Sequence, residues 1–357
     1  MRAKRSPARH RFAASVPSWV HVSKSLARDE LPIVASGRRV GVGARPALGP
    51  RLWRLYGALV SQHAHRVTRP KVLVAGATGY LGKQVIAALH AAGYPVRALA
   101  RDEGRLGDVR EMCAEVVVAE ATKAETLTDV VGDAGVLFSS LGKHDFKAKP
   151  SVWDIDYRAN MNLLDRAVAG GVQHVSFISV VGGPELRKLG IQAADARESV
   201  VDAIKSSGLT YNVLRPSGFF NDMQDFFNMA KGGTGWVLGD GTALMSPIHG
   251  ADLAAFVVEK LGDIDARNME FDVGGPDTLS YEEILNLAFA ALGKRPKLRR
   301  VPGWIASALP KVVRPFNAQV ADLTKAIVTM STDGAAAPNY GTHRLEAFFA
   351  ELAEELV

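Results

Sequence analysis

The stretch Lys71-Val-Leu-Val-Ala75, with Gly76-Ala-Thr-Gly79-Tyr-Leu-Gly82 directly after it, decides the fold of this chain. The first five residues are a short apolar run that ends at a glycine, as a buried parallel strand does. Apolar residues then recur at helical spacing from Leu81 to Leu89, and Gly93 is a typical residue for the end of such a helix. Residues 95–100 read as a second strand, so a βαβ unit fits within about thirty residues.

The glycine trio indicates a dinucleotide site because it follows a strand and opens a helix. Gly76 allows a tight turn, Gly79 lets the backbone approach a pyrophosphate, and Gly82 allows close packing of helix on strand. The first N–H groups of the helix then hold the phosphates. The alternative is a tight glycine turn that binds nothing. We expect further cofactor contacts from Thr78, Tyr80, Leu81, Ser140, Leu141 and Gly142.

The tip of the second strand selects the cofactor. An acid there favours NAD by binding the ribose hydroxyls, whereas an arginine accepts the 2′-phosphate of NADP. Arg101 comes first at this tip, and Asp102 follows it. The order favours NADP(H), and Asp102 keeps NAD open. The alternative interpretation of the pair is a solvated loop.

Strands and helices continue to alternate along the chain. The residues predict strands at 115–119, 135–139, 174–179 and 210–214, and helices at 123–131, 152–169 and 193–207. This alternation without hairpin signals predicts an α/β fold, a Rossmann-type doubly wound parallel sheet. Beyond residue 215 we expect a smaller α-rich lobe, with a strand at 268–273 and helices at 251–261, 280–292, 318–330 and 343–356. We therefore expect a leader at 1–70 and an NAD(P)-binding domain at 71–357, to which 215–357 contributes the substrate lobe.

The positive charge of the chain lies in its first 70 residues, which hold 14 Lys or Arg and two acids. The other 287 residues hold 29 basic and 35 acidic groups, which argues against a nucleic-acid-binding face on the folded domain. No stretch approaches the roughly 18 apolar residues of an integral membrane segment. The single cysteine, Cys113, excludes an intrachain disulfide.

The leader is poor in acids and rich in arginine, alanine and serine, as organellar transit peptides are. A chloroplast or a mitochondrion would then be its destination, and otherwise the protein is cytoplasmic. A disordered basic tail and a misplaced start codon fit the same composition. No metal site is expected: His63 and His65 lie in the leader without an acidic partner.

Several segments together resemble the NmrA-like group of atypical short-chain dehydrogenase/reductases. They are Val74-Ala-Gly-Ala-Thr-Gly-Tyr-Leu-Gly82, Ala98-Leu-Ala-Arg101, Asp156-Tyr-Arg-Ala-Asn160-Met-Asn162, Leu214-Arg-Pro-Ser-Gly-Phe-Phe220, Pro247-Ile-His249 with Asp252-Leu253, and Gly274-Gly-Pro276. Within that group, four stretches resemble divinyl chlorophyllide a 8-vinyl-reductase. These are Val152-Trp-Asp-Ile-Asp-Tyr157, Gly239-Asp-Gly241, Asp252-Leu-Ala-Ala-Phe256, and Tyr340-Gly with Leu345-Glu-Ala-Phe-Phe349.

The resemblance implies where catalytic groups would lie. Ordinary members of the superfamily reduce carbonyls with a serine and a Tyr-x-x-x-Lys motif, and Ser179 occupies the serine position. The tyrosine and lysine positions fall on Ala193 and Arg197, so the usual acid–base pair is absent. Arg197 is then a holder of the nicotinamide ribose or of a substrate carboxylate, or simply a surface charge. Tyr157, one helical turn before Asn160, is a third catalytic candidate, with packing as its alternative.

Substrate contacts are expected from Ser217, Phe219 and Phe220, which follow a sheet strand at its carboxyl end. Packing in the core is the alternative for both phenylalanines. His249 is expected to fix a loop. Residues 304–309 are expected to form a helix docked on the sheet, with contact to a membrane surface as the alternative.

The sequence predicts an NADPH-dependent reductase of a small or planar organic substrate, with 8-vinyl reduction of divinyl chlorophyllide as its most specific form. The absence of Tyr-x-x-x-Lys is compatible with reduction of a conjugated alkene, because water or another side chain can then supply the proton. The alternative is a non-catalytic NADP(H)-binding regulator or accessory subunit. The sequence leaves open whether the chain forms a homo-oligomer or binds a protein partner.

Overall fold

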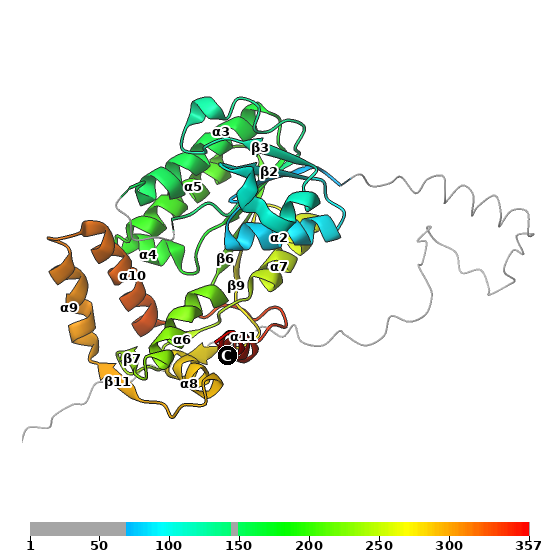
Figure 1. Cartoon of the computed structure of the whole chain (residues 1–357). Helices are drawn as coiled ribbons and strands as arrows, with labels where there is room; N and C mark the ends of the chain where they lie inside the picture. The colour runs from blue at the N-terminus through cyan, green and yellow to red at the C-terminus, as the bar shows by residue number, and fades with distance from the viewer. Residues whose placement is uncertain (1–68, 144–148, 357) are drawn as a thin grey trace, which may run out of the picture. The chain divides into compact units, whose positions relative to one another are not determined.

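A three-layer α/β/α domain accounts for the first half of the described chain (Figure 1). The computed structural model describes residues 69–143 and 149–356, all of which belong to one compact unit, Arg66–Val357. Its parallel sheet has seven strands in the order β3-β2-β1-β4-β5-β6-β9. They are β1 Val72–Ala75, β2 Val96–Ala100, β3 Glu115–Val118, β4 Val136–Ser139, β5 His174–Ile178, β6 Thr210–Pro216 and β9 Met269–Val273. The predicted doubly wound Rossmann-type sheet is confirmed.

Helices cover both faces of the sheet because successive side chains of a strand point to opposite sides. Val72 and Val74 of β1 pack under α2 (Tyr80–Ala91) and α7 (Gly250–Gly262). Leu73 and Ala75 pack under α3 (Asn160–Ala169) and α5 (Gln192–Ser206). The short helix α4 (Gly183–Lys188) precedes α5. Both β9 and α7 follow residue 215 in the chain but return to the sheet domain.

The remaining C-terminal residues form a second, helix-rich layer around their own apolar cluster. Its helices are α6 Gln224–Lys231, α8 Tyr281–Ala291, α9 Gly303–Val313, α10 Ala318–Asp333 and α11 Leu345–Glu354. Two small sheets, which we did not predict, pair β8 (Leu244–Met245) with β10 (Leu279–Ser280) and β7 (Gly235–Leu238) with β11 (Leu298–Val301). We also did not predict α4, α6 and the full length of α9.

The helix predicted at 123–131 is wrong, because only a 3₁₀ turn, Ala124–Thr126, forms there. The buried side chain of Arg97 on β2 donates to the carbonyl oxygens of Asp129 and Val130, which ties the chain after this turn to the sheet. The Thr126 hydroxyl also donates to the carbonyl of Lys123, at 2.8 Å. Such side-chain bonds compete with helix formation. The predicted helix at 152–169 is split into a π-helix, Trp153–Ala159, and α3.

Candidate functional site

The glycine turn lies between β1 and α2 at the carboxyl end of the sheet. Gly76 has φ +85°, a conformation that favours glycine, and Gly79 is the N-cap of α2 without any side-chain cap. A Cβ on Gly82 would overlap the carbonyl oxygen of Gly76, so helix and turn touch closely. The first N–H groups of α2 therefore point out of the helix with no intrahelical acceptor, as a phosphate requires.

The Tyr80 side chain ties this turn to the second half of the chain. Its hydroxyl oxygen accepts the N–H of Gly250 at the start of α7, at 3.0 Å. Its ring meets the edge of Phe219, with ring centres 6.2 Å apart. The turn is thus braced by residues that follow β6 in the chain.

Arg101 and Asp102 follow β2 and differ in what they contact. The Arg101 side chain is 58% exposed, and its ion pair with Glu120 is 3.7 Å long. The Asp102 carboxylate instead accepts the N–H of Gly104, at 3.0 Å, as the N-cap of the next helical segment. The arginine is therefore available to a ligand, while the acid is engaged by its own backbone.

Arg197 lies against the loop after β4, which we predicted to touch the cofactor. Its guanidinium donates to the carbonyl of Ile178 at 2.8 Å and pairs with Asp156 at 2.9 Å. A Cβ on Gly142 would overlap the Arg197 guanidinium, so the glycine is needed for this approach. Burial raises the pKa of the Asp156 carboxyl, and the Arg197 charge opposes that shift. Arg197 is therefore a paired and largely buried group, with its side chain 18% exposed.

The neighbouring predicted residues hold the end of β4 in place. The Ser140 hydroxyl lies over Gly76, where a Cβ would come within 2.6 Å of it. Asn160 accepts the Ser139 hydroxyl at 2.6 Å and donates to the carbonyl of Asp156 at 2.8 Å. The ring of Tyr157 packs on Trp153 and on the core beneath α3. The structure thus brings Ser140, Gly142 and Arg197 together beside the glycine turn.

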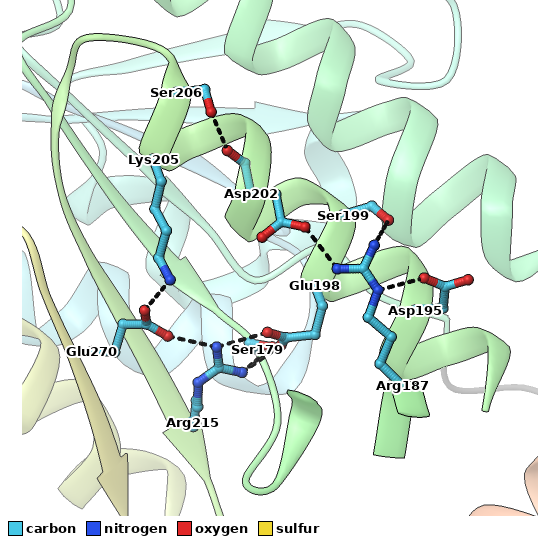
Figure 2. Close-up of polar contacts among 10 residues, drawn as sticks. All are labelled: Ser179, Arg187, Asp195, Glu198, Ser199, Asp202, Lys205, Ser206, Arg215 and Glu270. Atoms are coloured by element: carbon cyan, nitrogen blue, oxygen red, sulfur yellow. Dashed lines mark hydrogen bonds and ion pairs between the residues drawn. The ribbon is translucent and has the colours of Figure 1, made fainter. Parts of the chain in front are cut away.

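Ser179 follows β5, and its hydroxyl belongs to a buried network (Figure 2). It donates to Glu198 at 2.7 Å and accepts from Arg215 at 3.2 Å. Arg215 also bonds Glu198 and Glu270, and Lys205 pairs with Glu270 at the edge of the network. Burial alone lowers the pKa of Arg215, but its bonds to the two carboxylates raise it above its ordinary value. Arg215 therefore stays charged, and the proton of the Ser179 hydroxyl is already donated to Glu198.

The predicted substrate residues after β6 lie mostly in the interior. The Ser217 hydroxyl donates to the carbonyl of Ala335 and accepts the N–H of Ser246, at 2.9 Å for the latter. Phe220 is 1% exposed and packs in the core of the C-terminal layer. Phe219 is half-buried against Tyr80. Of these three residues, Phe219 alone lies beside the glycine turn.

A pocket of about 340 Å³ opens next to Phe220. Its walls are aromatic and its rim is polar; the lining residues are Phe220, His249, Thr342, His343, Arg344, Ala347, Phe348 and Glu351. The rings of His249 and His343 stack with centres 4.3 Å apart. His249 does fix a loop as the N-cap of α7, since its Nδ1 accepts the N–H of Ala251 at 3.3 Å. Burial, with the neighbouring His343, lowers the pKa of His249.

Three residues that bond to the predicted site residues were not identified from the sequence. Glu198 gave no signal in the sequence. Arg215 and Asp156 stood within quoted motifs, but nothing local paired Arg215 with Glu198 or Asp156 with Arg197. Among residues 69–143 and 149–356, no group of three or more His, Cys, Asp or Glu could hold a metal ion. Within the same ranges no helix is long and apolar enough to cross a bilayer.

Comparison with known proteins shows which proteins this chain resembles. Residues 76–263 match a family described as NAD(P)H-binding. The chloroplastic divinyl chlorophyllide a 8-vinyl-reductase of Oryza sativa subsp. indica is 30% identical over 326 residues, which cover 80% of this chain and 78% of that protein. Photosystem II assembly factor Ycf39 of Cyanophora paradoxa is 23% identical over 233 residues, covering 65% of this chain and 71% of that protein.

Solved structures show the same fold. The NADPH-dependent quinone oxidoreductase QOR2 of Escherichia coli, complexed with NADPH, matches with a TM-score of 0.63. The match covers 80% of this chain and 99% of that one at 16% identity, so the likeness is one of fold.

Proposed function

We propose that this chain, which belongs to the NAD(P)H-binding family of NmrA-like, atypical short-chain dehydrogenase/reductases, uses NADPH to reduce a planar organic substrate. The vinyl group of divinyl chlorophyllide is the first substrate to test, since several relatives carry that activity in their names. The observation that carries the cofactor assignment is the contrast between Arg101, which is exposed, and Asp102, which caps its own backbone.

Residues of the glycine turn and of the neighbouring elements would bind different parts of NADPH. The N–H groups of Tyr80 and Leu81 at the start of α2 would hold the pyrophosphate. Arg101 would form a bidentate pair with the 2′-phosphate, for which a guanidinium is well shaped. Arg197, already fixed by Asp156 and Ile178, would turn its remaining N–H groups to the nicotinamide ribose. NADPH, when bound, supplies the hydride.

The proton of the reduction has no donor of the usual kind. Ala193 carries no acidic proton, and the Ser179 hydroxyl is committed to Glu198. A conjugated alkene fits this arrangement, because protonation at carbon can follow from water after hydride transfer. We assign the planar substrate to the aromatic-walled pocket beside Phe220, where Phe348 offers a second ring surface and His249 a neutral imidazole.

The alternative function is a non-catalytic NADP(H)-binding regulator or accessory subunit. The engaged Ser179 hydroxyl and Ala193 favour it, and a relative is named as an assembly factor. It requires NADPH to remain bound without being oxidised. The leader at 1–70 lies outside the described residues except for 69 and 70; we propose that it directs the chain to a plastid, as the chloroplastic relatives suggest.

A titration followed by a turnover assay tests the proposal. The full chain, an Arg101→Gln variant and an Asp102→Asn variant are titrated with NADPH and with NADH by cofactor fluorescence. We expect Arg101→Gln to weaken NADPH binding about tenfold or more and to leave NADH binding nearly unchanged. Asp102→Asn is the matched control and should keep the NADPH preference.

The turnover assay then separates the two functions. NADPH oxidation with divinyl chlorophyllide, or with another conjugated alkene, would establish the reductase. Tight NADPH binding without oxidation by any acceptor would favour the accessory subunit. A chain that binds neither nucleotide would contradict both functions.

A further inference from the structure

Helix α9 presents an apolar face to solvent, which is unusual for a helix at the edge of a domain. Trp304 is 76% exposed, and Ile305, Leu309 and Val312 on the same helix are exposed as well. Phe316, directly after the helix, is 88% exposed. At about 100° per residue, the four side chains within the helix fall within an arc of roughly 140°. Elsewhere in the described chain, exposed apolar side chains such as Val118 and Ile264 occur singly, which is normal.

The opposite side of α9 packs on α10, which is itself anchored to the sheet domain. Ala306 of α9 is buried in this contact. The Asp322 carboxylate of α10 accepts the N–H of Gln192 at the start of α5, at 2.8 Å, and Lys325 donates to the carbonyl of Leu189. In Figure 1, α10 lies between α9 and α4, so α9 is the outer helix of the pair. The predicted docking of 304–309 on the sheet is therefore wrong.

The segment of sequence that contains this apolar face is basic. Residues 284–321 contain seven Lys or Arg and no acid, although the chain from 71 onward has more acids than bases. Lys311 is exposed and lies at the edge of the apolar arc, and Arg314 directly follows the helix. Arg299, on the strand β11 that leads into α9, is exposed and lies over the ring of Trp236, 5.7 Å from its centre. Tryptophan, phenylalanine and basic residues together match the composition of helices that lie in a membrane interface.

We propose that the α9 face, defined by Trp304, Ile305, Leu309, Val312 and Phe316, binds the surface of an anionic lipid bilayer. The apolar side chains would enter the boundary between headgroups and acyl chains, and the neighbouring bases would lie among the anionic headgroups. At eleven residues α9 is too short to span a bilayer, so it lies in the plane of the surface. The local excess of positive charge favours this occupant over a second copy of the chain, whose same face would repel it.

Vesicle binding by the full chain tests this proposal. Vesicles of phosphatidylcholine alone are compared with vesicles of equal parts phosphatidylcholine and phosphatidylglycerol, by co-sedimentation. We expect Trp304→Ser with Phe316→Ser to weaken binding to the mixed vesicles more than about tenfold. Ile264→Ser, which removes an equally exposed apolar side chain elsewhere, is the matched control and should have no effect. Lys311→Gln should weaken binding to mixed vesicles about fivefold and leave binding to neutral vesicles unchanged.

A local probe excludes a contribution from the basic leader, which all these variants share. An environment-sensitive NBD label at Leu309→Cys should shift to the blue when mixed vesicles are added, whereas the same label at Ile264→Cys should not. An unshifted label at Leu309→Cys would overturn the proposal even if the chain sediments with vesicles. A concentration-dependent dimer that Trp304→Ser with Phe316→Ser abolishes, without any vesicle binding, would overturn it in favour of an interface between copies.

Discussion

The glycine turn and the Ser179 network lie at the same edge of one sheet, yet their polar groups differ in exposure and in hydrogen bonding. At the turn, the N–H groups that open α2 lack a cap, and Arg101 is exposed. In the network, Ser179, Glu198 and Arg215 satisfy one another and are nearly inaccessible to solvent. The first region is built for a ligand. The second has the position of a catalytic centre but the bonding of a structural core, since buried charges must be paired.

The largest expected effect comes from breaking the network. Replacing Arg215 by methionine leaves the Glu198 carboxylate buried without its partner, which costs about 3–5 kcal/mol of unfolding free energy. Arg187→Met is the matched control: Arg187 also bonds two carboxylates and a serine, but its side chain is 38% exposed (Figure 2). That substitution should cost less than about 1 kcal/mol. Urea unfolding of both variants measures the difference, and equal losses would mean that the network is no more structural than a surface cluster.

A smaller effect is expected from a substitution in the glycine turn, and it should weaken NADPH binding more than it lowers the stability of the fold. In Gly82→Ala the new methyl group must push α2 away from Gly76, which displaces the N–H groups that would hold the pyrophosphate. We expect the dissociation constant for NADPH to rise about 10- to 100-fold, or about 1.4–2.7 kcal/mol. Gly262→Ala is the control, because a Cβ there would meet its nearest neighbour at 3.8 Å. Unchanged NADPH binding by a folded Gly82→Ala protein would show that the turn does not hold the cofactor.

The same contrast separates what the sequence could predict from what it could not. The turn is local: strand, glycines and helix are contiguous from residue 71, so their pattern predicted the sheet and the position of the turn. The network joins residues of β6, α5 and β9 with Ser179 after β5, so its bonds span residues 179 to 270. No local pattern marks such a pair. The bonds from Arg97 to the carbonyls of Asp129 and Val130 are nonlocal for the same reason.

The apolar face of α9 was ambiguous for a different reason. A run such as Trp304 to Leu309 suits a buried helix or an interfacial one equally well in sequence, since periodicity gives a face but not its neighbour. Only the packing of Ala306 on α10 shows which side is covered. Sequence therefore predicted the helix-rich lobe but not the exposure of this face.

The smallest effect on turnover is expected from replacing Ser179, although its position matches that of the catalytic serine in related enzymes. Its hydroxyl already donates to Glu198, so it has no second proton to offer a substrate. We expect Ser179→Ala to change kcat/KM for the accepted alkene, and the NADPH dissociation constant, by less than about twofold, or about 0.4 kcal/mol. Stability should fall by about 1 kcal/mol, the contribution of one hydrogen bond.

Ser176→Ala, on the strand β5 that precedes Ser179, is the control, because the Ser176 hydroxyl is buried without a partner among the described residues. Its removal should leave both activity and stability nearly unchanged. If Ser179→Ala instead lowers turnover a hundredfold or more, as the loss of a group that stabilises a developing negative charge does, Ser179 must leave Glu198 and face the substrate during the reaction. The network would then be a resting arrangement of a catalytic centre, and the two regions would differ only until substrate binds.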